Sequence, residues 1–340
     1  MVPTALFGPC RRKAPSRREA REIQMITERI DAITKIPDTH RWTIIPAPRS
    51  IKIEITARCN YSCSFCAHAD NLRTEGDMPL EMFSRLVKEF VAAGVEELGL
   101  FFLGESFMKS DLPEYVRTAK EAGIKYAFLT TNGSLAKPSR MRQVFEAGLD
   151  SLKFSLNYAD KAQFSDIARA NPLLFDIMLG NIRSAKDVRD EVFFRTGKMC
   201  RLYASYIEYD GEQSDRMKVL VDSLRPLLDE VYALPLYSQA ELVGEQERDR
   251  GWNVTAGNRG RSGALRDPLP CWSVFSEGHV TFDGKLSACC FDHNDSFTMG
   301  DLAAEPFMDA WNSEKFQQLR AAHLAKDVRN TACEQCVAYQ

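Results

Sequence analysis

The stretch IKIEITARCNYSCSFC, residues 51–66, holds the strand and the cysteines on which the fold prediction depends. Its first six residues form a short β-type run, with isoleucine at every second position. Cys59, Cys63 and Cys66 follow, so three thiols share the loop after that strand. Because parallel α/β proteins bind ligands at the carboxyl ends of their strands, this loop is a candidate site.

Downstream of the cysteines, β-type runs alternate with amphipathic stretches as far as residue 236. Such alternation requires parallel strands joined by right-handed crossovers, and therefore an α/β fold. Six units are too few for an eight-stranded barrel, so an open partial barrel and a doubly wound sheet remain as alternatives. The strands are expected at 51–56, 97–103, 125–131, 151–156, 201–208 and 230–236, and the helices at 79–94, 112–123, 138–148, 173–189 and 216–228.

The composition is that of a soluble globular protein. The 340 residues are 44% hydrophobic and 27% charged, with a net charge of -3. No global basic surface for nucleic acid is present, and no apolar run is long enough to span a membrane. Eight of the ten cysteines fall in two groups, which indicates metal ligands in a reducing compartment, the cytoplasm, rather than a secreted disulfide scaffold.

Four segments are predicted: a tail with a capping helix over 1–45, an α/β domain over 46–236, a linker or lid over 237–270, and a small metal-held domain over 271–340. The tail is rich in Arg and poor in acidic residues, which leaves an organellar transit peptide as an alternative. Cys10 in this tail is expected to have no role.

Three thiolates within eight residues can bind three corners of a [4Fe–4S] cluster and leave one iron open. The alternative is a zinc knuckle with His68 as the fourth ligand, because structural zinc sites are closed by four ligands.

The second group contains four thiols that can close a complete site, either [4Fe–4S] or zinc. These are Cys271, Cys289, Cys333 and Cys336. The segment around them has little predicted core beyond an Asp–Gly hairpin at 279–289, so we expect the metal to stabilise it. Cys290 is left over and is expected to be a small buried side chain.

The spacing C-x3-C-x2-C, with Phe65 before the third cysteine, resembles the signature loop of the radical SAM superfamily. The resemblance covers about residues 50–236 and implies a partial (β/α)6 barrel. It also implies S-adenosylmethionine on the open iron, cleaved to a 5′-deoxyadenosyl radical by an electron from a donor such as flavodoxin or ferredoxin.

Residues at the ends of the next strands resemble the family's cofactor-binding positions. Gly104 and Glu105 resemble its glycine–glutamate motif, although Leu103 replaces the usual first glycine. A carboxylate there would accept hydrogen bonds from the methionine ammonium. The other residues that the resemblance implies are Phe65, Thr131, Asn132, Ser155 and Asn157.

The C-terminal segment resembles the SPASM/twitch domains that follow radical SAM barrels. Five cysteines, where the full SPASM form has seven, point to the shorter twitch form with one auxiliary [4Fe–4S] cluster on Cys271, Cys289, Cys333 and Cys336. The resemblance gives Cys290 a second interpretation, as the thiol that returns hydrogen to a substrate radical in an epimerase.

We therefore expect an iron–sulfur oxidoreductase that oxidises or epimerises a carbinol carbon of a sugar- or aminocyclitol-like small molecule. One alternative is modification of a ribosomally made peptide, and another is a non-catalytic metal-binding protein. Arg259, Arg261 and Arg266 could bind a phosphate or face solvent.

Overall fold

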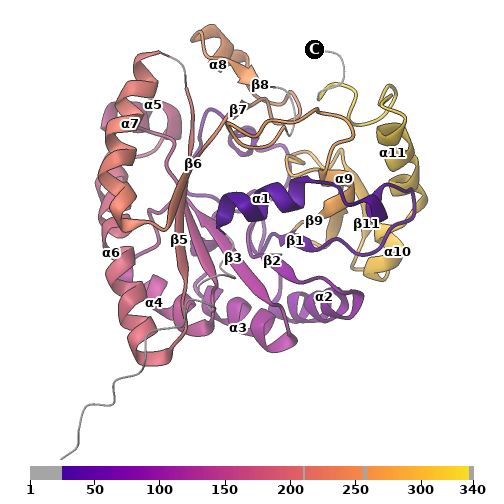
Figure 1. Cartoon of the computed structure of the whole chain (residues 1–340), viewed down its shortest axis with the longest axis horizontal. Helices are drawn as coiled ribbons and strands as arrows, with labels where there is room; N and C mark the ends of the chain where they lie inside the picture. Colours follow the sequence, from indigo (N-terminus) through magenta and orange to yellow (C-terminus); the bar gives the residue numbers. More distant parts are fainter. Residues whose placement is uncertain (1–24, 210, 256–258, 337–340) are drawn as a thin grey trace, which may run out of the picture.

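The computed structural model describes residues 25–209, 211–255 and 259–336 (Figure 1). The predicted tail, with Cys10, lies outside the described residues. The predicted capping helix is α1 (Ile26–Thr34). None of the helices in the described ranges is both long and apolar enough to cross a membrane.

Six parallel strands form the centre of the fold, and each pairs with the next one along the chain. This consecutive order is that of an open partial barrel and excludes the doubly wound sheet. The strands are β1 (Ser50–Ile53), β2 (Glu97–Gly99), β3 (Tyr126–Thr131), β4 (Ser151–Ser155), β5 (Arg201–Ile207) and β6 (Glu230–Leu234).

Helices alternate with these strands and cover the outer face of the sheet (Figure 1). The longest of them, α6, continues to Thr196 rather than ending near residue 189, because Val188 and Val192 keep burying its inner face until Gly197 ends it. A short helix that was not predicted, α5, begins after Asp160. The helices of the barrel are α2 (Leu80–Ala93), α3 (Leu112–Ala122), α4 (Pro138–Ala147), α5 (Lys161–Ala168), α6 (Leu173–Thr196) and α7 (Glu212–Leu224).

The C-terminal region continues the barrel sheet on the free side of β1. Strand β9 (Glu277–Val280) pairs with β1 in parallel, and the predicted hairpin joins it to β10 (Lys285–Ser287) and then β11 (Thr298–Asp301). Gly284 has a φ of +90° in the hairpin turn, a conformation that suits glycine. The C-terminal segment is therefore continuous with the barrel sheet.

The expectation that this segment has little core was wrong. Its helices are α9 (Ser273–Ser276), α10 (Phe307–Trp311) and α11 (Glu314–Leu324). Phe307, Trp311 and Phe316 are buried, and the Trp311 ring stacks on that of Phe307 and contacts that of Phe316 at a tilt. Arg320, also buried, donates to the Trp311 carbonyl at 2.8 Å and the Thr43 carbonyl at 3.0 Å, which joins α11 to the segment before β1.

The predicted linker region contains β7 (Leu236–Tyr237), α8 (Glu245–Asp249) and β8 (Val254–Thr255), with β7 and β8 paired in parallel. Short 3-10 turns lie at Asp38–His40, Ala67–Asp70, Ser106–Met108 and Arg225–Leu227.

Helix α1 crosses the middle of the sheet (Figure 1). Arg29 forms an ion pair with Glu97 of β2 at 2.6 Å, and its guanidinium stacks 3.4 Å from the ring of Tyr126. Asp31 pairs with Arg261 at 2.8 Å. These contacts hold the helix over the interior of the barrel.

Candidate active site

The first cysteine loop follows β1 and is held on both sides. Two of its backbone amides, at positions 62 and 64, donate to carbonyls at the end of α5 at 3.1 and 2.8 Å. The side chain of Gln239 accepts from the Ala67 amide at 3.1 Å. The Cys63 thiol lies 3.4 Å from the Tyr158 hydroxyl. The loop is thus fixed by α5 and by the segment after β7.

The three thiols of this loop lie close enough to influence one another electrostatically. Burial raises the pKa of Cys59 to about 12 and that of Cys66 to about 11, and it raises the pKa of Cys63 further. Three neighbouring thiolates need positive charge to form in such a place. The irons of a cluster supply that charge, so the donor set fits an iron–sulfur cluster.

The zinc alternative is not favoured by the position of His68. Its Nε2 lies 2.8 Å from the Ala57 carbonyl oxygen and 3.4 Å from a Glu75 oxygen, so that nitrogen is engaged outside the cysteine group. Across the described residues, no three His, Cys, Asp or Glu side chains gather closely enough to hold a single metal ion.

Gly104 packs directly against the cysteine loop. A Cβ atom at this position would lie 2.9 Å from the Arg58 carbonyl oxygen and closer still to that of Thr56. The next amide, that of Glu105, donates to the same Arg58 oxygen at 2.8 Å. Glycine is needed here because the backbone of the two segments touches.

The Glu105 carboxylate is 3% exposed and already accepts three hydrogen bonds from the chain. Thr131 Oγ1 and the Phe107 amide donate to Oε1 at 2.9 and 3.0 Å, and the Asn132 amide donates to Oε2 at 2.7 Å. Burial raises its pKa. Glu105 thus joins the ends of β2 and β3, a bracing role that sequence analysis did not predict.

Asn132 extends this bracing into the cysteine loop. Its side-chain amide donates to Asn60 Oδ1 at 2.9 Å, and Asn60 in turn donates to Ser134 Oγ at 2.9 Å. The predicted cofactor residues therefore divide into two sets. Gly104, Glu105, Thr131 and Asn132 support the loop, whereas Phe65, Ser155 and Asn157 line a cavity.

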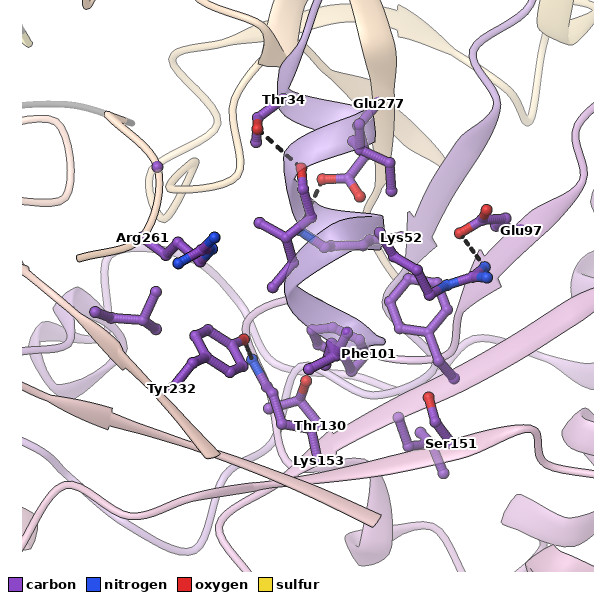
Figure 2. Close-up of a pocket in the computed structure, with 18 of the residues that line it drawn as sticks. Thr34, Lys52, Glu97, Phe101, Thr130, Ser151, Lys153, Tyr232, Arg261 and Glu277 are labelled. Atoms are coloured by element: carbon purple, nitrogen blue, oxygen red, sulfur yellow. Dashed lines mark hydrogen bonds and ion pairs between the residues drawn. The ribbon is translucent and has the colours of Figure 1, made fainter. Parts of the chain in front are cut away.

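Two cavities occupy the interior of the barrel and share Lys52, Phe101, Lys153, Leu234, Tyr237 and Trp272 as lining residues. The outer cavity, of about 300 Å³, is also lined by Phe65 of the first cysteine loop and by Cys290. The inner cavity, of about 190 Å³, lies beneath α1 and is shown in Figure 2. The outer cavity therefore has one wall from each cysteine group.

The second cysteine group assembles from distant segments. The charges of Cys333, Cys336 and Cys290 all raise the pKa of Cys271, which burial already raises. The pKa of Cys289 is raised chiefly by its contact with Cys290, and also by burial and by the charge of Cys336. The four predicted ligands and Cys290 are thus neighbours, and the nine described cysteines form no disulfide. This donor set also fits a cluster.

His323 of α11 lies inside this group and was not predicted. The Cys271 amide donates to its Nδ1 at 3.2 Å, so the proton is on Nε2, which lies 3.4 Å from the Cys333 sulfur. Burial lowers the pKa of His323 to about 4, which keeps the ring neutral. The ring thereby links two of the predicted ligand segments.

The structure also shows the surroundings of Cys200 and of the three arginines whose roles the sequence did not decide. Cys200, beside β5, is buried as expected. Arg261 pairs with Asp31, Arg259 donates to the Arg266 carbonyl at 3.3 Å, and Arg266 donates to the Thr34 carbonyl. All three arginines are thus bound to the chain itself.

Sequence reasoning missed Lys52 and Lys153, which line both cavities. A signal for them exists: each is a charged residue inside an apolar run that forms a buried parallel strand. Lys52 pairs with Glu277 of β9 at 2.7 Å. Burial alone would raise the pKa of Glu277, but the charges and hydrogen bonds of Lys52 and His279 outweigh it and lower that pKa to about 2.

Family models match both parts of the chain. The radical SAM superfamily model matches residues 53–197, and that of the iron–sulfur cluster-binding domain SPASM matches residues 271–337. The chain thus contains a radical SAM domain followed by a SPASM domain. Its two domains imply a [4Fe–4S] cluster, S-adenosylmethionine and an auxiliary cluster.

Curated relatives match only part of the chain. GTP 3′,8-cyclase of Tolumonas auensis is 35% identical over 128 residues, 36% of this chain and 37% of the relative. The enzyme of that name from Marinobacter nauticus is 32% identical over 139 residues, 40% of this chain and 41% of the relative. The chain thus spans about two fifths of the length of these relatives.

Solved structures match more of the chain at lower identity. BtrN in complex with AdoMet and 2-DOIA has a TM-score of 0.54 and 14% identity, covering 84% of this chain and 92% of that one. Streptococcus suis SuiB bound to its precursor peptide SuiA has a TM-score of 0.61 and 16% identity, covering 86% and 70%. These likenesses concern the fold alone.

Gly104→Ala should displace the first cysteine loop, since the new methyl group meets backbone oxygens that cannot rotate away. We expect anaerobically reconstituted protein to fall from about eight irons per chain to about four. Iron and sulfide analysis measures this.

The control is Gly180→Ala, in α6, where a Cβ meets nothing within 4 Å. That variant should keep its iron and gain about 0.5–1 kcal/mol in helix stability. Full iron content in Gly104→Ala would show that the contact with Gly104 does not position the loop.

Proposed function

We propose that this protein is a radical SAM oxidoreductase whose small-molecule substrate binds in the outer cavity, between the two cysteine groups. The observation that carries the proposal is that Phe65 and Cys290, one from each group, line the same cavity. A substrate there reaches both groups without leaving the interior of the barrel.

Cys59, Cys63 and Cys66 would hold the cluster that binds S-adenosylmethionine, and Cys271, Cys289, Cys333 and Cys336 the auxiliary cluster. When bound, these groups supply a 5′-deoxyadenosyl radical that takes a hydrogen atom from the substrate and an acceptor for the electron left behind. With loss of the hydroxyl proton, the result is a two-electron oxidation of a carbinol to a carbonyl. In this proposal the auxiliary domain is of the twitch form.

The chain's own residues hold the reactants. Ser155 and Asn157, at the end of β4, offer polar groups to the cofactor, and Asn157 is fixed by accepting from the Ile207 amide at 3.3 Å. Glu105 retains a lone pair on Oε2 for the methionine ammonium, because that oxygen accepts a single hydrogen bond from the described residues. Trp272 and Phe101 contribute apolar surface to the walls of both cavities.

The size of the outer cavity, about 300 Å³, supports a small molecule over a peptide. BtrN, a neighbour in fold, is named with a small molecule, and SuiB with a peptide, so the fold accommodates both. We place the protein in the cytoplasm, with flavodoxin or ferredoxin as the electron donor.

The triple variant Cys59→Ala, Cys63→Ala, Cys66→Ala should lose 5′-deoxyadenosine formation and keep about four irons per chain. Anaerobic incubation with S-adenosylmethionine and dithionite, followed by chromatography, measures the product. Cys200→Ala, which removes a buried thiol away from both groups, should behave as wild type. Continued cleavage of S-adenosylmethionine in the triple variant would refute the assignment of these three cysteines to the cluster that binds the cofactor.

The reaction class is tested with a panel of deuterated sugars and aminocyclitols, together with their acids and phosphate esters. We expect one class to transfer deuterium to 5′-deoxyadenosine and to yield a product two electrons more oxidised, with turnover retained in Cys290→Ala. A product of unchanged oxidation state carrying a solvent-derived hydrogen, with turnover lost in Cys290→Ala, would make the enzyme an epimerase instead.

A further inference from the structure

Four cations line the two cavities in the described part of the chain, and three of them have carboxylate partners. Arg29 pairs with Glu97 at 2.6 Å, Lys52 with Glu277 at 2.7 Å, and Arg261 with Asp31 at 2.8 Å. Lys153 is the fourth. Within the described residues no carboxylate lies at ion-pair distance from it.

The nearest polar contact of the Lys153 ammonium is the Tyr232 hydroxyl, at 3.3 Å (Figure 2). A tyrosine oxygen accepts the hydrogen bond but supplies no negative charge. Burial and the nearby charge of Lys52 lower the pKa of Lys153 to about 8, although the charge of Glu277, which lies beyond ion-pair distance, acts in the opposite direction. Among the four cations that line the cavities, Lys153 is thus the one with no carboxylate in direct contact within the described residues.

We propose that Lys153 binds an anionic oxygen group of the substrate, a carboxylate or a phosphate. The inference rests on the proposed function, in that it takes the outer cavity as the substrate site. A buried ammonium without a counter-ion is costly, and a ligand that brings a negative charge into contact removes that cost. The substrate is then an acid or a phosphate ester rather than a neutral polyol.

The position of Lys153 suits this role. It lies on β4 two residues before Ser155, so both side chains point to the same face of the sheet. It lines both cavities, whereas Phe65 and Cys290 line only the outer one. An anionic group held at Lys153 therefore leaves the rest of the substrate directed toward the two cysteine groups.

Neighbouring hydroxyls can complete the anion site. Tyr232 of β6 lies directly across from Ser205 of β5 in the sheet register, and Ser205 lines the outer cavity. The ammonium and these two hydroxyls are all hydrogen-bond donors, which suits a group with several acceptor oxygens.

Bromide is the first probe, because it is an anion that anomalous scattering locates without ambiguity. Anaerobic crystals of the holoprotein with S-adenosylmethionine, soaked in bromide, should show a peak at the Lys153 ammonium. The peak should vanish in Lys153→Met, while bromide sites elsewhere remain. No peak at Lys153 with those other sites filled would overturn the proposal.

S-adenosylmethionine carries a carboxylate of its own, so a second set of bromide-soaked crystals, grown without the cofactor, tests whether Lys153 binds that group. A bromide peak that appears only without the cofactor would show that Lys153 holds the cofactor carboxylate, and this overturns the substrate assignment. A tenfold weaker affinity of Lys153→Met for S-adenosylmethionine would also overturn the substrate assignment. We expect that affinity to change by less than twofold.

Thermal unfolding of the holoprotein in anion-poor buffer gives an independent measure. Lys153→Met should raise the midpoint, because it removes an unbalanced buried charge. The matched variant Lys52→Met should lower it, because Glu277 then loses its partner. Equal destabilisation by both would mean that the Lys153 charge is already balanced within the chain, contrary to the proposal.

The deuterated panel then tests the substrate class. Acids or phosphate esters should transfer deuterium at least tenfold faster than their neutral parents, and Lys153→Met should raise their KM at least tenfold. Equal transfer from the neutral parents would overturn the inference while leaving the radical chemistry intact. Failure of S-adenosylmethionine cleavage would instead refute the proposed function, since bromide binding and unfolding do not require it.

Discussion

The parallel pairing of β1 with β9 is the contact on which the rest of the site depends. It aligns Ser50 with Glu277 and Lys52 with His279, positions that lie 227 residues apart along the chain. The first cysteine loop follows the carboxyl end of β1, and Cys271 precedes the amino end of the neighbouring β9, so this pairing sets the two cysteine-bearing segments side by side in the barrel wall, where Phe65 and Cys290 line the same cavity. Without it the outer cavity would have no second wall.

The same pairing sets the electrostatics of the interior. It places Glu277 beside Lys52, and this buried ion pair leaves Lys153 as the one of the four cavity-lining cations that contacts no carboxylate of the described residues. His279 adds a contact to Glu277 at 3.2 Å, so the carboxylate is fully engaged. Lys52 of β1 therefore stabilises the fold through its ion pair, whereas Lys153 of β4 is left for ligand recognition.

Local patterns in the sequence were sufficient for the α/β class and for the grouping of the cysteines, whereas the choice of a partial barrel over a doubly wound sheet came from the family resemblance. Strands and helices alternate with glycine at their ends, as at Gly94 and Gly123, and these signals act within a few residues. The cysteine spacing at 59, 63 and 66 is equally local. Helix α6 ran longer than predicted because burial of Val192 continues the same inner face.

Contacts between distant segments could not be predicted in this way. Strand periodicity does not show which strand borders β1, so the pairing with β9 and the partner of Lys52 were missed. His323 lies 52 residues from Cys271, and only packing of α11 brings its ring between two cysteine segments. The bracing role of Glu105 likewise depends on β2 and β3 being neighbours, which places Thr131 and Asn132 at its carboxylate.

The central claim is that the two cysteine groups hold two different clusters, of which only the first has an open iron. Mössbauer spectroscopy of anaerobic protein reconstituted with ⁵⁷Fe tests it most directly. The account predicts about eight irons per chain, one of which changes its signal when S-adenosylmethionine is added. Four irons or fewer, or a spectrum that the cofactor leaves unchanged, would contradict it.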